Sequence, residues 1–538
     1  MSDRGIGRRQ FLRATGSAIG GGHLAHGMWG VRTFGQAPGL IRSDSERPSI
    51  RQGVQSGDVL GDRAIVWSRT DRPARMLVEY DTTNRFANPR TVRGPYALPV
   101  SDFTAKLDLV GLPAAQDILY RVRFEDLNSS RAVSEAVVGR FRTAPSDGRD
   151  IRFVWSADTC GQGFGINTDW GGMKSYEAMR RVEPDFFIHS GDTIYADGPI
   201  PSELVVENGR VWRNLVTEAK SKVAQTLDDF RGAYLYNLLD DNVRRFNADV
   251  PQVWQWDDHE VLNNWSPSTD LSRDPRFTEK SVELLAARAS RAFLEYAPMR
   301  WHTPDEAERV YRKIPYGPLL DVFVLDMRSY RGPNSFNRQP TLDDSSAFLG
   351  RAQVEWLTRE LQQSRATWKV IAADMPIGRP VPDGQDEQGR PKFDAIANGD
   401  GPPLGRELEV AEVLRAIKRN RLRNIIWLTG DVHYTAAHYY DPAKARFGDF
   451  DAFWEFVSGP IHAGGTSTGP LPPDDTFGLD VVFQRWAGVT TASPFMGALF
   501  FGEVSIDAKT RILTVRLKDL DNVTHFTKTI EPIDMVTG

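Results

Sequence analysis

A carboxylate and a phenol follow a short apolar run near position 190. Residues 186–188 (Phe-Phe-Ile) predict a buried strand, and the Ser-Gly-Asp of 190–192 predicts a sharp turn at its end. Asp192 and Tyr195 lie on the segment that leaves this turn. Because open α/β folds carry their chemistry at the carboxyl ends of strands, these two side chains are candidate site residues.

Three further apolar runs are followed by side chains of similar kinds. Each pair comes directly after a predicted buried strand: Asp158 and Cys160 after 151–156, Asp258 and His259 after 253–256, and Asp431 and His433 after 424–429. Four strand ends that deliver carboxylate, imidazole, phenol and thiol groups predict a metal centre. Two neighbouring cations need several anionic ligands, and Asp192 is the natural bridge between them.

The ligand types restrict the metals. A phenolate such as that of Tyr195 favours a hard trivalent ion, iron above all, and the carboxylates suit iron or calcium. Few neutral imidazoles are present, so a pair of zinc ions is less suitable. Arg328, just beyond the predicted strand 321–325, could bind a phosphate group with its two-pronged guanidinium.

These side chains also have structural interpretations. Asp192 and Asp431 could form turns, Tyr195 and His259 could be packed rings, Asp258 and Asn263 could cap a helix, and Arg328 could form an ion pair. Cys160 is the sole cysteine, so no intramolecular disulfide can form, and such a thiol is most often buried in a core. Its place two residues after Asp158 favours a thiolate ligand instead.

The bulk properties are those of an ordinary globular protein. The 538 residues are 40% hydrophobic and 25% charged. A formal net charge of -5 predicts no general affinity for nucleic acid or anionic membrane. No run reaches the roughly 18 apolar residues of a spanning helix, so we expect no transmembrane anchor.

The N-terminus resembles a twin-arginine export signal. Arg8 and Arg9 precede a Phe-Leu pair and a stretch rich in Gly and Ala, 14–27, and a small-residue cleavage site falls near residue 37. We therefore expect residues 1–37 to be a signal peptide that engages the twin-arginine export machinery. The mature protein would then be periplasmic or secreted. A disordered basic tail is the alternative.

Two strand patterns divide the remaining chain. Residues 38–147 alternate short apolar runs with polar turns, which predicts a small all-β sandwich of the fibronectin or immunoglobulin type. The polar segment 143–150 predicts a linker. In residues 148–538, short apolar strands alternate with helical stretches, which predicts a layered α/β domain.

Four ordered blocks link the chain to a known family: Asp158-Thr-Cys160, Gly191-Asp192-Thr-Ile-Tyr195, Asp257-Asp258-His259-Glu260 and Gly430-Asp431-Val-His433. With them the chain resembles the calcineurin-like metallophosphoesterases, and most closely the PhoD-like alkaline phosphatases. The resemblance covers essentially the whole chain after the signal. It implies a layered αββα-type metallophosphoesterase sandwich behind the small β-sandwich.

The resemblance also implies roles for individual residues. Asp158 and Asp192 bind metal, with Asp192 as the bridge, and Tyr195 matches the tyrosinate that marks iron in purple acid phosphatases. Asp258 stands in place of a metal-binding Asn, Asp431 replaces the first His of a Gly-His-x-His block, and His433 keeps the second. With Cys160, the candidate ligands are Asp158, Cys160, Asp192, Tyr195, Asp258, Asp431 and His433.

One metal-binding His of the superfamily has no match in this chain. Ala373-Asp374-Met375-Pro376 occupies its place. This difference favours an oxygen-ligated second ion such as calcium. The expected cofactors are therefore Fe³⁺ and Ca²⁺, with other divalent cations as alternatives.

The implied function is that of an exported, metal-dependent alkaline phosphatase. It would hydrolyse phosphate monoesters, diesters or both through a metal-bound hydroxide. His259 would protonate the leaving group, and Arg328 would bind the phosphoryl oxygens. The alternatives are a phosphodiesterase or phospholipase D-like enzyme on the same scaffold, a non-catalytic exported binding protein, and a metal-storage or sensing protein.

Overall fold

The structure, a computed structural model, describes residues 47–302, 306, 308–465, 472–489 and 491–534. All of these residues belong to one unit, Asp44–Gly538. The predicted signal peptide, residues 1–37, lies outside the described residues. Among the described helices, none is both long and apolar enough to cross a membrane.

A nine-stranded mixed sheet carries three of the four predicted strand ends. Its strand order is β24-β23-β22-β8-β9-β12-β1-β2-β5. The bounds are β1 Val54–Gly57, β2 Arg63–Arg69, β5 Thr104–Val110, β8 Ile151–Ser156, β9 Phe186–Ser190, β12 Gln252–Gln255, β22 Phe500–Ile506, β23 Leu513–Asp519 and β24 Thr524–Ile530. Since β8, β9 and β12 run parallel, their carboxyl ends lie at one edge of the sheet.

A seven-stranded sheet carries the fourth predicted strand end, that of β18. Its order is β13-β14-β15-β18-β20-β19-β21. The bounds are β13 Arg312–Pro315, β14 Leu320–Val324, β15 Trp368–Ala372, β18 Ile425–Thr429, β19 Thr435–Tyr440, β20 Phe453–Val457 and β21 Leu479–Arg485. Strands β14, β15, β18 and β20 are parallel, so the loops that follow them also emerge at a common edge.

The two sheets pack face to face through a dry apolar layer. Trp155 and Ile188 of the first sheet and Val370, Leu428 and Phe456 of the second belong to this core and are fully buried. These strands are buried on both faces, which explains why they are continuous apolar runs rather than alternating ones.

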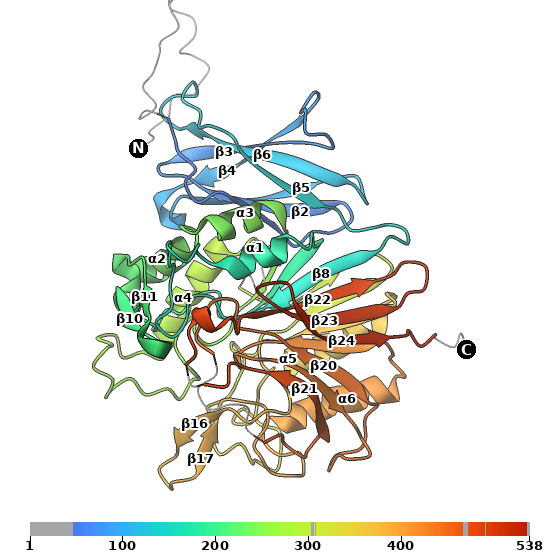
Figure 1. Cartoon of the computed structure of the whole chain (residues 1–538). Coiled ribbons are helices and arrows are strands. Elements are labelled where there is room, and N and C mark those ends of the chain that lie inside the picture. The colour runs from blue at the N-terminus through green and yellow to red at the C-terminus, as the bar shows by residue number, and fades with distance from the viewer. Residues whose placement is uncertain (1–46, 303–305, 307, 466–471, 490, 535–538) are drawn as a thin grey trace, which may run out of the picture. The chain divides into compact units, whose positions relative to one another are not determined.

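Helices cover the outer face of each sheet (Figure 1). The helices α1 Lys174–Arg180, α2 Leu227–Asn237, α3 Asp241–Asp249 and α4 Val282–Tyr296 share a core with the nine-stranded sheet. The helices α5 Arg351–Gln363 and α6 Glu407–Arg419 share one with the seven-stranded sheet. Local signals set their starts: Thr226 and Asp229 form a capping box at α2, and Ser281 caps α4. The predicted αββα layering is confirmed.

The N-terminal strands form the predicted all-β sandwich. A four-stranded sheet, β4-β3-β6-β7, packs on β1, β2 and β5 through its own apolar cluster. Its strands are β3 Ala74–Asp81, β4 Arg90–Ala97, β6 Asp117–Asp126 and β7 Val137–Arg142. Strand β1 also pairs with β12 through Gly57 and Gln252, so the sandwich continues the nine-stranded sheet. Sequence periodicity cannot show such a pairing between distant segments.

Two short hairpins lie in the connecting segments. Strand β10 (Glu203–Val205) pairs with β11 (Val211–Arg213) in the segment before α2. The loop at 380–404 contains a second hairpin, β16 (Pro382–Gln385) with β17 (Pro391–Phe393).

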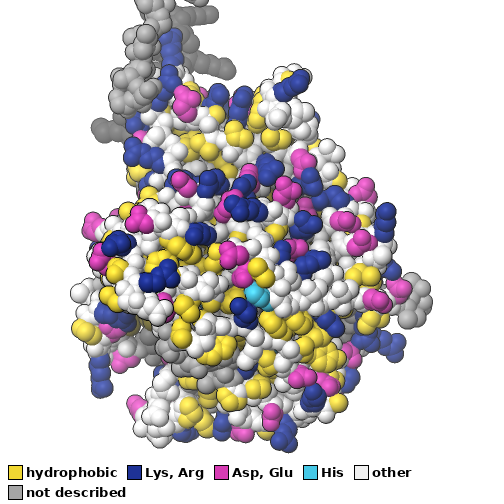
Figure 2. All heavy atoms as spheres, in the orientation of Figure 1, with side chains coloured by type: hydrophobic (Ala, Val, Ile, Leu, Met, Phe, Trp, Pro, Cys, Tyr) yellow, Lys and Arg dark blue, Asp and Glu magenta, His cyan; other side chains and the backbone are white. Residues whose placement is uncertain are grey.

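Acidic and basic side chains are intermixed over the face of the molecule shown in Figure 2.

Candidate metal centre

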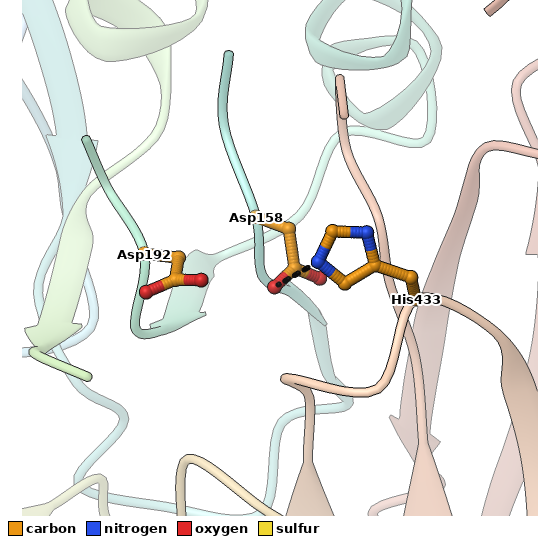
Figure 3. A group of neighbouring side chains, drawn as sticks. All are labelled: Asp158, Asp192 and His433. Atoms are coloured by element: carbon orange, nitrogen blue, oxygen red, sulfur yellow. Dashed lines mark ion pairs between the residues drawn. The ribbon is translucent and has the colours of Figure 1, made fainter. Parts of the chain in front are cut away.

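The four predicted strand ends meet in space. Three groups of side chains each bring ligand atoms within 4.8 Å of one another: Asp158, Asp192 and His433; Asp192, Asp258 and His259; Asp257, Asp258 and Asp431. Figure 3 shows the first group, with the carboxylate of Asp158 beside the imidazole of His433 and that of Asp192 on the other side of Asp158. Asp192 belongs to two groups and Asp258 to two, so the groups form a continuous chain. A shared carboxylate is the arrangement that a bridging ligand requires.

The backbone is left-handed at the acidic residue after each of three strands. The φ angles are 69° at Asp158, 54° at Asp192 and 67° at Asp431. Asp tolerates this region better than most residues, but the conformation is uncommon and is concentrated at functional sites. Gly191, with φ 94°, allows a close approach, since a Cβ there would lie 2.4 Å from the Cβ of Asp257. The turns therefore hold the carboxylates together.

Asp158 lies fully buried at the centre of the first group. Its Oδ1 is 3.5 Å from Nε2 of His433, and neither carboxylate oxygen has a hydrogen-bond partner among the described residues. Burial, assisted by the charge of Asp257, raises the pKa of Asp158 well above its ordinary value. Burying an unpaired carboxylate is costly, so these bare oxygens fit a bound cation.

Asp192 and Asp431 also have raised pKa values. Burial raises the pKa of Asp192 well above its ordinary value, and the nearby charges of Asp258 and Asp257 add to the effect. The pKa of Asp431 is raised by burial and then by the same two neighbours. A group of like charges in a dry site is stable only if protons or metal ions neutralise it.

His433 presents one ring nitrogen to the acidic group. Its Nδ1 is hydrogen-bonded to the carbonyl oxygen of Gly464, which assigns the proton to that nitrogen. Nε2 is then free to accept, and it lies 2.9 Å from the phenol oxygen of Tyr195. Burial lowers the pKa of His433 to about 4, which keeps the ring neutral. A neutral imidazole oriented by a carbonyl is the usual form of a metal ligand.

His259 stacks on the ring of Tyr195. The two rings stack with centroids 4.1 Å apart, and Nδ1 of His259 donates to Asp197 at 2.7 Å. Burial opposes a charge on this ring, but the carboxylates of Asp197 and Asp258 outweigh it and raise the pKa of His259 to about 9. A charged imidazolium at neutral pH has the proton that a general acid needs.

Arg328 is enclosed by carboxylates. Its Nε lies 2.6 Å from Asp257 and its Nη1 2.9 Å from Asp394, and Asp374 is 3.7 Å away. The side chain is fully buried. This network favours the ion-pair interpretation of Arg328 over direct binding of phosphate.

Cys160 lies in the apolar core. Its Sγ is 3.8 Å from the sulfur of Met173, and burial raises the pKa of the thiol. None of the three groups found among the described residues includes it. The placement favours the core interpretation, because a thiol turned toward apolar neighbours has little thiolate character.

We expect Cys160→Ala to retain the metal content and the visible absorption of the parent protein. Removing a core thiol takes away packing but no ligand, so only a modest loss of stability should follow. Elemental analysis and absorption spectra of the two proteins test this. Loss of an absorption band in the variant would establish thiolate ligation instead.

Other polar candidates lie outside the three groups. The side chain of Asn263 is exposed, and its backbone N–H donates to Asp197. The remaining buried histidines have partners elsewhere: His189 contacts Thr159, His438 contacts Glu455, and His462 contacts the carbonyl of Gly165.

Three acidic residues of the site are missed by the sequence argument. Asp257 and Glu260 stand in the same block as Asp258, and Asp374 follows β15 at the place of the absent histidine. All three are buried, and Asp257 and Asp374 each keep one oxygen without a hydrogen-bond partner among the described residues, that of Asp374 lying 3.7 Å from Nε of Arg328. The sequence pattern that could have identified these three residues is the one used for the other candidates, namely an acidic residue that follows a predicted strand.

Packed sheets between helices, with a shared carboxylate at the strand ends, define a protein of the metallophosphoesterase class. The sequence model of the PhoD-like phosphatase family matches residues 153–517, and that of the family's N-terminal domain matches residues 35–145. The chain belongs to the PhoD-like phosphatase family, as the sequence resemblance predicts. It is thus a phosphoric ester hydrolase.

Individual relatives agree with this assignment. The chain is 28% identical over 482 residues to alkaline phosphatase D of Bacillus subtilis (strain 168), covering 85% of this chain and 76% of the relative. Its fold is similar to a solved structure of PhoD, with a TM-score of 0.65, 22% identity, and coverage of 91% and 93% of the two chains. A purple acid phosphatase, PPD1 of yellow lupin (Lupinus luteus), gives a TM-score of 0.54 at 13% identity, covering 90% and 74%. These two structures support the fold alone.

Proposed function

We propose that the protein is an exported alkaline phosphatase that hydrolyses phosphate monoesters, diesters or both with bound iron and calcium. The observation that carries the metal requirement is the cluster of buried carboxylates with bare oxygens, on Asp158, Asp257 and Asp258. Only cations or protons can stabilise such a cluster, and a phosphoesterase uses the cations. Activity at alkaline pH is supported by the name of the Bacillus relative, alkaline phosphatase D.

The donor types divide the cluster into two parts. Asp158, Asp192, Tyr195 and His433 provide the mixed oxygen and nitrogen set that suits Fe³⁺. Asp257, Asp258 and Asp431 form a group of carboxylates alone, the all-oxygen set that suits Ca²⁺, and Asp192 lies beside Asp258 in a group that also includes His259. Asp192 would belong to both parts as the bridge. Other divalent cations could occupy the all-oxygen part.

The bound metals would neutralise charge on the phosphoryl group and activate the attacking water. The chain itself would supply the proton for the leaving oxygen, from His259 held by Asp197. The stacked ring of Tyr195 keeps the imidazole in one orientation. Arg328 would act indirectly, by holding the carboxylates of Asp257 and Asp394 in place.

Export and domain division rest on the sequence. Arg8 and Arg9 support a twin-arginine signal over residues 1–37, and hence a periplasmic or secreted protein delivered by the twin-arginine machinery. The proposed domains after it are the β-sandwich at 38–147 and the catalytic domain at 148–538. Secretion of a reporter fused after residue 37, with an Arg8,Arg9→Lys,Lys fusion as control, tests the signal.

Chelation is expected to remove metal and hydrolysis together. We expect at least about a hundredfold loss in the rate of hydrolysis of a chromogenic monoester and diester, because the loss removes the main electrostatic stabilisation of the transition state. Restored iron and calcium should restore both rates and a visible absorption band from Tyr195. Full activity of demonstrably metal-free protein would contradict the proposal, and the ratio of the two rates gives the preferred ester class.

A further inference from the structure

Glu260 is a buried carboxylate that faces backbone rather than any of the three ligand groups. Its Oε2 accepts hydrogen bonds from the N–H of Asp192 at 3.1 Å and of Asp257 at 2.8 Å, and its Oε1 accepts one from Thr193 at 2.6 Å. The residue has no solvent exposure. One side chain thus joins the loop after β9 to the loop after β12.

These two loops carry several residues of the site. Asp192 and Tyr195 come from the first, and Asp257 and Asp258 from the second. The backbone of the first loop is left-handed at Asp192, where an N–H without a partner would be buried. A side chain whose two oxygens together accept three backbone N–H groups can hold such a turn.

We propose that Glu260 is a positioning residue that sets the distance between Asp192 and the Asp257–Asp258 pair, and thereby the metal affinity of the all-oxygen part of the site. This inference rests on the proposed function only in assuming that Asp192 and Asp258 bind metal. Groups that orient metal ligands typically contribute tenfold to a hundredfold in metal affinity.

The test uses two variants of the full chain, Glu260→Gln and Glu260→Asp. Gln removes the charge and turns an amide N–H₂ toward the backbone donors. Asp keeps the charge but is one methylene too short to reach all three N–H groups. Calcium titration calorimetry of chelator-stripped protein should show affinity about tenfold to a hundredfold weaker for both variants. If only Gln weakens binding, the effect is that of charge, and the positioning role is overturned.

A matched control is available in α6. Glu409 is also buried, and its Oε2 accepts from the N–H groups of Phe348 at 3.0 Å and Leu349 at 2.6 Å, outside the three ligand groups. Glu409→Gln should lower thermal stability yet keep the calcium affinity of the parent. An equal loss of affinity in Glu409→Gln would reduce the role of Glu260 to general stability and overturn the proposal. Calcium binding by the parent without hydrolysis would instead refute the proposed function alone.

Discussion

Asp192→Asn is expected to lower the rate of phosphate ester hydrolysis by about a hundredfold to a thousandfold while the fold stays intact. The Asp192 carboxylate belongs to two ligand groups, so its loss weakens both parts of the site at once. Asn is close in size and keeps the oxygen that accepts from the backbone N–H of His259. Steady-state rates, metal content and circular dichroism of the purified variant measure the outcome.

Asp321→Asn provides the matched control for this substitution. Asp321 is also a buried acidic residue, but its partners are Ser364 and Lys313, and it lies in none of the three groups. We expect it to keep the rate of the parent at the cost of some stability. Full activity of Asp192→Asn would remove the bridge from the mechanism, and with it the two-part site.

Arg328→Met is expected to reduce the free energy of unfolding by about 3–5 kcal/mol. The substitution leaves Asp257 as a buried carboxylate without its ion-pair partner, whereas Asp394 keeps its pair with Arg331. Breaking a buried pair is costly because the remaining charge is neither solvated nor neutralised. Urea unfolding of the metal-free proteins measures the effect without a contribution from bound metal.

Arg351→Met is the control for the loss of an arginine in an ion pair. Arg351 pairs with Glu355 on α5, and the two side chains are 92% and 59% exposed. An exposed pair contributes at most about 1 kcal/mol, so this variant should unfold close to the parent. If Arg328→Met kept full stability and lost only the affinity for phosphate, Arg328 would be a substrate ligand, as the sequence first suggests.

The layers of the fold were readable from local patterns. Apolar runs such as Phe186–Ile188 are buried on both faces, and the alternating strand Ala74–Asp81 has one buried face. Each pattern indicates how many faces of the strand are buried. The pairing of β1 with β12 cannot be predicted from such patterns, because each strand would be buried in the same way beside a different neighbour.

The positions of the candidate ligands were likewise readable, since Asp192, Asp258 and Asp431 each follow a strand that the sequence predicts. Their convergence follows from the parallel order of the strands within each sheet together with the packing of the two sheets against each other. What a strand end does not reveal is the direction of the next side chain. Cys160 and Asp158 are two residues apart, yet one faces Met173 and the other His433.

The sequence by itself therefore determined the family, the layers and the types of candidate ligand, because these depend on residue identity and spacing along the chain. The tertiary structure alone decided which groups share a carboxylate, that Arg328 is held by Asp257 and Asp394, and that Glu260 joins two ligand loops. Those features depend on distances between segments far apart in the chain. Such distances are set by the packing of the two sheets, and no local pattern encodes them.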